Sequence, residues 1–498
     1  MRLPMTRQIL LQNGNLLVHD EKDHVIPTRA DLLIENDRIK EIRENIEPSG
    51  AMLVIDCSDK IVSPGFIDTH HHLWQSQQKG MHCDQILLDY YHSGNLASSH
   101  YSAKDIFLGE LGGALELLDA GTTTVVDHAH LNYTPEHSKE ALRALVASGV
   151  RAVFCYCAHP RVETWHPELQ FDKDMLPDWV METFKELSTK QPFGPNGRVR
   201  LGFAIDPGFC SQHELKQVFA EARSNGAHLI TSHGTKVAML DMPSTIDVLA
   251  KSELLGPDVL ISHANATTKE ELSKLKESGV HLSSTPITEM QMGHGHPLCL
   301  MPYFNGLSSL GVDCHSVSNC FLPNQMITAL QASRARIFEQ AQAKREWDAT
   351  VGPTVENAYN LGTIFGARAA KLDHEIGSLK VGKKADIIIF SEKTPTMVLA
   401  SACDPVAAIV LHSSVRDVET VIVDGIIRKE NCSLLKTSLP KGLGADDGEE
   451  RPLSWSELAS ELVQSSTELK KKTDAVDEDT ARDGLIRAFL EDLTRLKI

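Results

Sequence analysis

The stretch that decides the fold is Pro64-Gly65-Phe66-Ile67-Asp68-Thr69-His70-His71-His72, an apolar run that ends in an acidic residue and three consecutive histidines. Side chains alternate between the two faces of an extended strand, so His70 and His72 should point the same way and His71 away from them. Two imidazoles on one face, at the carboxyl end of a buried strand, can form half of a divalent metal site. The alternative is a polar loop that happens to be rich in histidine, since the chain contains 23 histidines.

Further strand-like runs follow, most of them separated by stretches with the apolar spacing of helices. The eight runs lie at about 61–68, 122–128, 151–157, 199–205, 227–233, 258–263, 280–285 and 308–313. Eight strands with helical connections predict an α/β fold of the (β/α)8 TIM-barrel type. A doubly wound parallel sheet is the alternative, but no glycine-rich phosphate loop follows the first strand.

The two ends of the chain differ from the interior, because short strand-like pieces alternate there with turns. We therefore expect residues 1–62 and 372–435 to build one small β-sandwich domain beside a metal-dependent barrel of residues 63–371.

The last part of the chain, residues 440–498, is predicted to be a linker followed by a helical extension. Its apolar spacing includes Leu458, Leu462 and Leu485. A docked or partly disordered appendage is favoured over a helix that binds a partner.

Composition narrows the function classes. The net charge of −18 argues against a nucleic-acid-binding or anionic-membrane-binding surface. No run approaches the roughly 20 apolar residues of a membrane span, and the amino terminus lacks a signal-peptide pattern. The ten cysteines form no CxxC pairs, which favours reduced thiols and a cytoplasmic location.

The ends of the predicted strands carry residues that can bind a metal ion: His70 and His72 in the first, His233 in the fifth, His263 in the sixth and Asp313 in the eighth. All should lie at the carboxyl end of the barrel, where such folds hold their active sites. Three imidazoles and one carboxylate can hold a divalent ion and leave a position for water. The ion lowers the pKa of that water enough to supply hydroxide near neutral pH, and a histidine and a carboxylate beside it can move protons.

Several motifs resemble the amidohydrolase superfamily, and they occur in the right order over roughly residues 5–430. They are PGFIDTHHH, LLDAGTTTVVDH at 117–128, His233, His263, GVDCHS at 311–316 and GARAAKLDHEIGSLKVGKKADIIIF at 366–390. The chain looks most like the mononuclear branch, which contains cytosine deaminases, guanine-type deaminases and triazine hydrolases. The binuclear branch has a carboxylated lysine at the end of strand four, where this chain reads VRLGFAIDPG, so a single metal ion is expected.

The resemblance implies roles for individual residues. His70, His72, His233 and Asp313 match the family's metal ligands, and His263 matches the histidine that orients or polarises the activated water. Asp313 also matches the base that takes the proton from that water. One divalent ion per chain is implied, most often Zn2+ and sometimes Fe2+.

One position departs from the deaminases of this branch. They usually carry a glutamate three residues after the strand-five histidine, to protonate the heterocycle nitrogen, whereas this chain has Lys236 there. A lysine cannot replace that carboxylate. Lys236 either faces the solvent or binds a carboxylate or phosphate of the substrate, and Glu289, after strand seven, is a candidate for the missing catalytic acid.

Other candidates lie near the predicted mouth of the barrel. His128, Gln75 and Trp74 are expected to contact substrate, although His128 has the alternative of a hydrogen-bonded rim histidine. His130, on the same face as His128, could contact substrate too, with the same alternative. His92, Asp206 and His315 are weaker candidates, and His71 is expected to serve the fold. Two long insertions, Gln75–Ala103 and His159–Gly197, should lie over the mouth.

These observations predict a metal-dependent hydrolase whose metal-generated hydroxide attacks a non-peptide C–N bond. Its substrate is expected to be a small cyclic or aromatic amide, an amidine or an aminated heterocycle. A decarboxylase or other lyase on the same scaffold, and a non-catalytic binding protein, are the alternatives. The expected partners are a small-molecule substrate and, by resemblance, further copies of the chain in a dimer or larger assembly, with no nucleic acid and no membrane.

Overall fold

The computed structural model describes residues 7–234, 243–438 and 452–489. Its central sheet contains eight parallel strands, which neighbour one another in sequence order. They are β6 (Phe66–His71), β7 (Thr122–Ala129), β8 (Arg151–Ala158), β11 (Val199–Ile205), β12 (Ile230–His233), β13 (Val259–Ser262), β14 (His281–Ser284) and β15 (Ser308–Leu310).

The sheet closes on itself between its first and last strands. The segment after β15 pairs in parallel with β6 through Asp313 and His71, and the Asp313 N–H donates to the His70 carbonyl at 2.8 Å. The predicted (β/α)8 barrel is therefore confirmed, and a doubly wound sheet, which has two open edges, is excluded.

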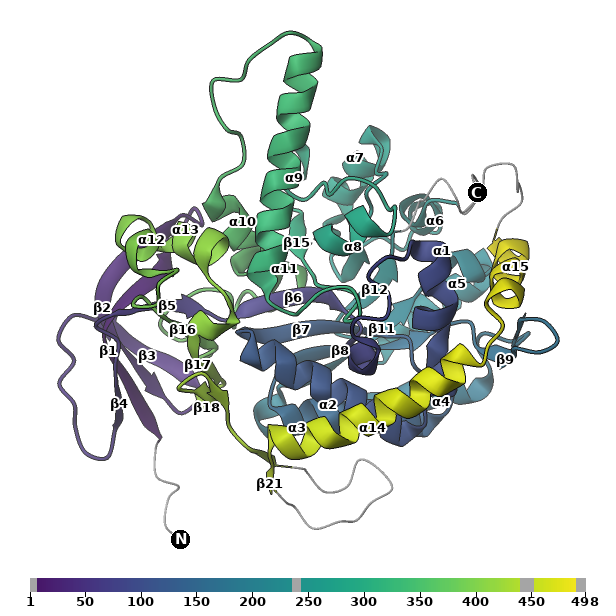
Figure 1. Ribbon diagram of the computed structural model, residues 1–498, viewed down its shortest axis with the longest axis horizontal. Coiled ribbons are helices and arrows are strands. Elements are labelled where there is room, and N and C mark those ends of the chain that lie inside the picture. Colours follow the sequence, from purple (N-terminus) through teal and green to yellow (C-terminus); the bar gives the residue numbers. More distant parts are fainter. Residues whose placement is uncertain (1–6, 235–242, 439–451, 490–498) are drawn as a thin grey trace.

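Helices lie between successive strands and cover the outside of the barrel (Figure 1). They include α2 (Ala103–Asp119), α3 (Pro135–Ser148), α4 (Asp178–Ser188), α5 (Gln212–Ser224), α6 (Thr245–Lys251), α7 (Lys269–Ser278), α8 (Pro286–Gln291), α9 (Leu322–Ala343), α10 (Val355–Leu361) and α11 (Ile364–Ala369). Local sequence explains several of their starts. Ser102 and Asp105 form a capping box at α2, for example, and Thr268 and Glu271 form one at α7.

The first predicted strand, at 61–68, combines parts of two strands. Lys60–Pro64 is β5 of a second sheet, and β6 of the barrel begins at Phe66, so only Gly65 separates them. A Cβ at Gly65 would lie 2.0 Å from Thr123 Oγ1, which requires glycine at this crossing. The prediction merged the two strands because both are apolar and the break between them is a single residue.

The second sheet has nine strands and draws on both ends of the chain, as expected for the small β-sandwich domain. The amino-terminal part contributes β1 (Gln8–His19), β2 (Val25–Glu35), β3 (Arg38–Arg43), β4 (Leu53–Asp56) and β5, and the later part contributes β16 (Ile387–Ser391), β17 (Val418–Val423), β18 (Ile426–Glu430) and β19 (Ser433–Leu434). The two parts meet where β5 pairs with β16 in antiparallel fashion. The exact residue limits of the domains stay a prediction.

Two insertions rise over the carboxyl ends of the barrel strands. The first contains η1 (Leu73–Gln78), α1 (Leu87–Tyr90), η2 (Tyr91–Asn95) and η3 (Leu96–His100), and the second contains β9 (Val162–Thr164) and β10 (Gln170–Phe171). The carboxyl-terminal helices pack beside them: α14 (Trp455–Asp474) lies along α2 and η1, and α15 (Glu478–Phe489) contacts α1 and η2 (Figure 1). The predicted linker from residue 440 lies mostly outside the described residues.

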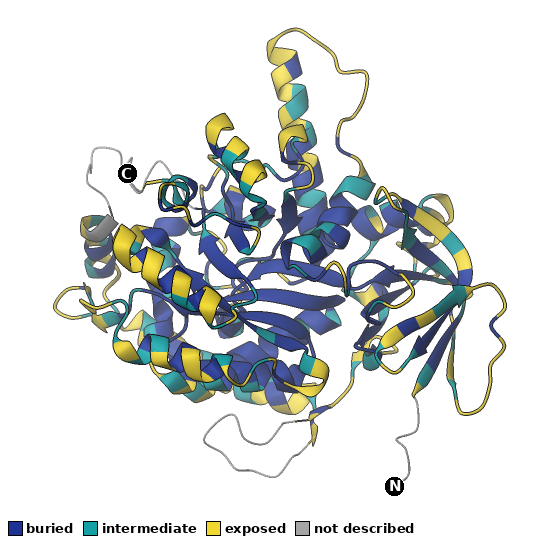
Figure 2. Cartoon of the chain, turned by 180° about the vertical axis from the view of Figure 1, so that it is seen from behind, coloured by how far each residue is buried: buried dark blue, intermediate teal, exposed yellow. Residues whose placement is uncertain are grey.

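The barrel strands are more deeply buried than the elements around them. Every residue of β7 and β8 is buried, whereas the outer part of α9 and the loop after it project into solvent (Figure 2). Within the described ranges, no helix has both the length and the apolar character needed to cross a membrane.

Candidate metal centre and active-site cavity

The structure brings four histidines and one aspartate together at the carboxyl end of the barrel. His70 belongs to β6 and His72 directly follows it, and His233 ends β12. His263 follows β13, and Asp313 follows β15. The Asp313 carboxylate lies between them, because its Oδ1 is 3.1 Å from His72 Nε2 and 3.4 Å from His70 Nε2, and its Oδ2 is 4.0 Å from His263 Nε2.

Three of the imidazoles are held through their Nδ1 atoms. His72 Nδ1 donates to the His128 carbonyl at 2.7 Å, His233 Nδ1 contacts the Asp206 carboxylate at 3.0 Å, and His263 Nδ1 pairs with Thr285 Oγ1 at 3.0 Å. Each Nε2 is thereby left to face the cluster, which is the arrangement of histidines that ligate metals.

The donor set fits a divalent cation. Nε2 of His70 is buried and has no hydrogen-bond partner among the described residues, although an unpaired buried polar atom is costly. Two triads have their ligand atoms within 4.8 Å of one another: His70 with His233 and His263, and His70 with His72 and Asp313. The five side chains are therefore placed to surround one ion, and their roles as ligands stay a prediction.

The charge states of the cluster also suit a metal. Burial lowers the pKa of His70 and of His72, so both imidazoles are neutral near pH 7 and keep a lone pair for a cation. Burial alone would raise the pKa of Asp313, but its contacts with His70 and His72 outweigh that effect and hold the pKa well below its usual range. The carboxylate is thus ionised.

Two residues of the histidine–aspartate cluster have strained backbone conformations. His263 has a φ of 64° and Asp313 a φ of 70°, both in the left-handed region that residues with a Cβ rarely adopt. Each follows the end of its strand and turns its side chain into the cluster. Such conformations persist where the surrounding structure over-determines them, and they concentrate at functional sites.

The opposite face of β6 carries a hydrogen-bonded network. His71 points away from the cluster, as expected, and its Nδ1 contacts Asp68 Oδ2 at 2.6 Å while its Nε2 contacts His315 Nδ1 at 2.8 Å. Asp68 Oδ1 accepts the N–H groups of His70 and Val312, both at 3.2 Å. The network therefore ties together the two backbone segments that carry His70, His72 and Asp313.

Glu289 lies behind His263. Its carboxylate is fully buried and accepts hydrogen bonds from the Thr285 N–H at 2.8 Å, Ser284 Oγ at 2.9 Å and Asn265 Nδ2 at 3.1 Å, with Oε1 3.8 Å from His263 Nδ1. These contacts are those of a group that positions His263. A direct role for Glu289 as catalytic acid stays a prediction.

The predicted substrate contacts are engaged with other side chains. His128 pairs with Thr231 Oγ1 at 3.1 Å, Gln75 Nε2 donates to the Tyr90 hydroxyl at 2.7 Å, and the Trp74 ring packs edge-on against Tyr101 at a centroid distance of 4.9 Å. As far as the structure describes the cavity wall, none of His128, Gln75 and Trp74 belongs to it. Lys236 lies outside the described residues.

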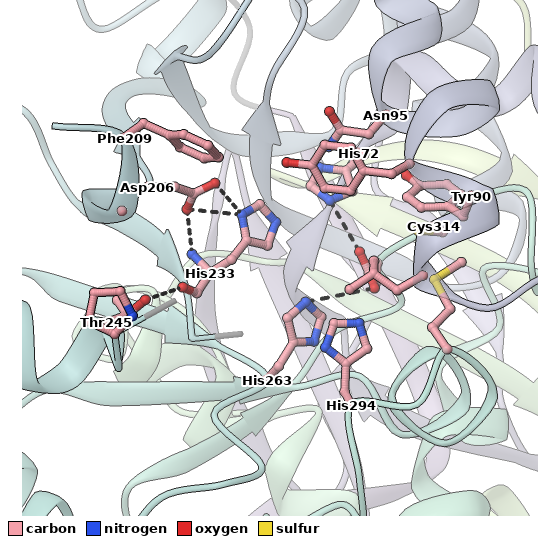
Figure 3. A pocket seen from close by; sticks show the side chains of 16 residues that line it. His72, Tyr90, Asn95, Asp206, Phe209, His233, Thr245, His263, His294 and Cys314 are labelled. Carbon is pink, nitrogen blue, oxygen red and sulfur yellow. Dashed lines mark hydrogen bonds and ion pairs between the residues drawn. The ribbon is translucent and has the colours of Figure 1, made fainter. Parts of the chain in front are cut away.

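A cavity opens beside the cluster (Figure 3), and the sequence analysis missed most of its wall. The lining residues that it did not single out include Leu87, Tyr90, Tyr91, Asn95, Phe209, Thr245 and Cys314. Most of them belong to short helical segments, in which too few residues follow one another for periodicity to reveal which side chain faces inward. The aromatic rings and the few polar groups are typical of a pocket for a small, flat molecule.

Two polar groups of the wall have shifted pKa values. Burial lowers the pKa of His294 to about 3, so its imidazole is neutral near pH 7. Burial alone would lower the pKa of His233, but the Asp206 carboxylate outweighs it and raises the pKa. Asp206, a weaker candidate from sequence, therefore fixes the orientation and the charge of His233.

Comparison with known proteins agrees with this geometry. Residues 61–427 match the model of the Amidohydrolase family. A 5′-deoxyadenosine deaminase of Methanobrevibacter smithii is 28% identical over 417 residues, which cover 82% of this chain and 89% of that protein. A 5-methylthioadenosine/S-adenosylhomocysteine deaminase of Thermococcus kodakarensis is 27% identical over 436 residues, covering 84% and 93%.

Solved structures share the fold. An adenosine deaminase of Xanthomonas campestris with bound zinc superposes with a TM-score of 0.75 at 16% identity, covering 94% of this chain and 99% of the other. An atrazine chlorohydrolase of Arthrobacter aurescens, complexed with zinc, has a TM-score of 0.73 at 18% identity, covering 93% and 99%.

Proposed function

This chain belongs to the amidohydrolase family and is a metal-dependent hydrolase of carbon–nitrogen bonds other than peptide bonds, and on that premise we propose that it deaminates an adenine nucleoside related to 5′-deoxyadenosine. The observation that carries the proposal is the cluster of four imidazoles and Asp313 at the wall of an aromatic cavity. The two deaminase relatives, aligned over most of their length, support this substrate class.

The proposed ligands are His70, His72, His233 and Asp313, which would hold one ion per chain, Zn2+ rather than Fe2+. A divalent ion at this position supplies positive charge that lowers the pKa of a water molecule and yields a nucleophile near neutral pH.

The side chains around that water move its protons. Asp313, held ionised, accepts a proton from the attacking water, and His263, 4.0 Å away, orients the carboxylate and the water. The water oxygen forms a bond to C6 of the purine, and the bond from C6 to the amino nitrogen breaks. One proton of the water passes through Asp313 to the departing nitrogen, which leaves as ammonia, and the other ends on ring N1 of the 6-oxopurine product. Glu289 assists by holding His263.

The residue at position 236 favours a second candidate function. A lysine stands where related deaminases carry the glutamate that protonates a ring nitrogen. Hydrolysis of a chloride or an alkylamine from an activated ring such as a triazine has less need of that acid. We therefore keep triazine-type hydrolysis as the alternative.

Product analysis tests the two candidates. The zinc-loaded enzyme is incubated with 5′-deoxyadenosine, adenosine, guanine, cytosine and a chlorotriazine, and ammonia and chloride are quantified. We expect ammonia from an adenine nucleoside. Chloride release from the triazine without ammonia from any adenine nucleoside would contradict the first proposal and support the alternative.

We also propose a cytoplasmic homo-oligomer. None of the ten cysteines forms a disulfide, which supports a reducing compartment. Phe338 near the projecting end of α9 lies 6.4 Å, centroid to centroid, from the tilted ring of Trp347 in the loop that follows, and Trp347 is 81% exposed. Exposed apolar groups on a protruding arm are typical of protein contacts. Light scattering should show a dimer or larger assembly that Trp347→Ser weakens, and a monomeric wild-type protein would contradict this.

A further inference from the structure

We infer that the carboxyl-terminal helix α15 sets the shape of the substrate cavity, because it holds Tyr91 in the cavity wall. The inference names a specificity determinant for the proposed function. It concerns a part of the chain beyond residues 61–427, the range that matches the family model.

The contact between α15 and the cavity wall is apolar. Leu485 of α15 is fully buried in a cluster with Leu88, Leu96 and Leu169, and Tyr91 packs against that same cluster. Tyr91 also lines the cavity. Tyr91 therefore connects the cluster that contains Leu485 to the wall of the cavity.

Helix α15 joins the two insertions that rise over the barrel. Leu88 and Leu96 belong to the insertion after β6, and Leu169 belongs to the one after β8. The approach to the second insertion is close, since a Cβ at Gly484 would lie 2.8 Å from Leu169 Cβ. Two ion pairs flank the apolar contact: Arg482 with Asp89 at 3.8 Å, and Arg487 with Glu168 at 3.6 Å.

The neighbouring wall residue is anchored differently. The Tyr90 hydroxyl accepts a hydrogen bond from Gln75, in the η1 segment directly after β6, at 2.7 Å. Tyr91 packs against two apolar clusters, the one that contains Leu485 and the one that contains Tyr90 and Met292. Because α15 belongs only to the first, loss of the α15 contact should loosen Tyr91 on that side, and it should leave the histidine cluster at the barrel mouth intact.

Helix α14 fixes α15 in place. Ser465 Oγ donates to Asp105 Oδ1 at 2.7 Å, Ser466 Oγ donates to the Gln77 carbonyl at 2.6 Å, and Lys472 Nζ donates to the His100 carbonyl at 2.8 Å. The extension is therefore attached to the first insertion through Gln77 and His100, and to α2 through Asp105, before α15 begins.

The test uses Leu485→Ala in the full-length enzyme, with Leu485→Met as the conservative variant. Val463→Ala on α14 is the matched control, because Val463 is 68% exposed. The measurements are hydrogen–deuterium exchange of peptides that span 87–96 and 159–171, zinc content, and kcat and KM for 5′-deoxyadenosine.

We expect Leu485→Ala to speed exchange in both peptides and to raise KM about fivefold, since a cavity replaces the leucine side chain and the wall loosens. Zinc content and kcat should stay near the wild-type values, and Leu485→Met and Val463→Ala should behave like the wild type. Unchanged exchange in 87–96, or an unchanged KM beside faster exchange, would overturn the inference.

Failure of the proposed function is distinguishable from failure of the inference. If the wild-type enzyme releases ammonia from no adenine nucleoside, the proposed function is wrong. The exchange measurement, which needs no substrate, still decides the inference: unchanged exchange around Tyr91 in Leu485→Ala overturns it, and faster exchange there and in 159–171 supports it.

Discussion

On one face of strand β6, His70 and His72 turn a ring nitrogen toward Asp313, whereas on the other face both ring nitrogens of His71 have partners in Asp68 and His315. All three histidines are buried and adjacent in sequence. His70 Nε2 has no hydrogen-bond partner within the described part of the chain, so it can accept a cation. His71 has no lone pair to spare, and it holds the backbone that presents its neighbours. What an imidazole does here depends on whether its second nitrogen is already occupied.

We expect the largest effect from substitution of Asp313, the carboxylate toward which His70 and His72 point. Asp313→Asn should lower kcat/KM about 1,000-fold, because an amide cannot accept the proton from water. Steady-state kinetics of the zinc-supplemented variant measures this, with a circular dichroism spectrum to show that the fold is kept. Asp84→Asn, at an exposed position, is the control and should retain wild-type activity. Full activity of Asp313→Asn would contradict the mechanism.

Substituting one histidine on each side of the strand tests whether the two sides have different roles. His72→Phe should abolish zinc binding, since phenylalanine offers no lone pair. His71→Phe should keep the zinc and lower the free energy of unfolding by about 3 kcal/mol, because Asp68 and His315 lose their partner in the interior.

Elemental analysis and urea denaturation separate these outcomes, with the exposed His213→Phe as the control. If His71→Phe were as stable as the wild type but had lost its zinc, the two faces would not have the separate roles assigned to them.

A substitution of Glu289, which lies behind His263, tests whether a supporting residue contributes less to catalysis than Asp313 in the cluster. Glu289→Gln should lower kcat about tenfold without changing KM, because glutamine keeps only one acceptor oxygen and its nitrogen must face either the Thr285 N–H or Asn265 Nδ2, both of which donate. A loss of the size expected for Asp313→Asn would instead favour Glu289 as the catalytic acid. The ratio of the two variants' kcat values is the decisive measurement.

We expect the smallest effect, on the pH dependence of stability, from His228, which lies on neither side of β6. Burial lowers the pKa of His228 from 6.5 to about 4, and its Nε2 donates to the Ala370 carbonyl at 3.0 Å. Its contribution to stability is complete above pH 6.5 and is lost as the pH falls toward 4, because the unfolded state binds the proton more readily.

His228→Gln keeps a donor and removes the titration, so it should lose about 1 kcal/mol less stability than the wild type between pH 7 and about pH 5.5. Thermal unfolding at the two pH values measures this. Equal losses would show that His228 is not held neutral in the folded state.

Much of the fold was predictable because its signals are local. The apolar runs and the helical spacing between them indicate the barrel, and the histidines stand at strand ends that can be recognised from sequence. The first strand was merged with β5 because the break between the two sheets is one glycine, and its cause, the approach of Thr123, is a contact between distant residues.

The surroundings of the cluster were less predictable. His128, Gln75 and Trp74 stand in or near the barrel mouth, yet each is engaged by a neighbour in the fold. Tyr91 and Phe209 line the cavity from helical segments of a few residues, where residue type alone does not tell an inward side chain from an outward one.

The sequence by itself determined the barrel, the small domain built from both ends and the set of side chains able to bind a metal, because strand alternation and residue order are properties of short segments. Only the tertiary structure decided that Glu289 supports His263 and that Leu485 holds Tyr91. These relations join residues 26 and 394 positions apart, and packing rather than local preference brings them together.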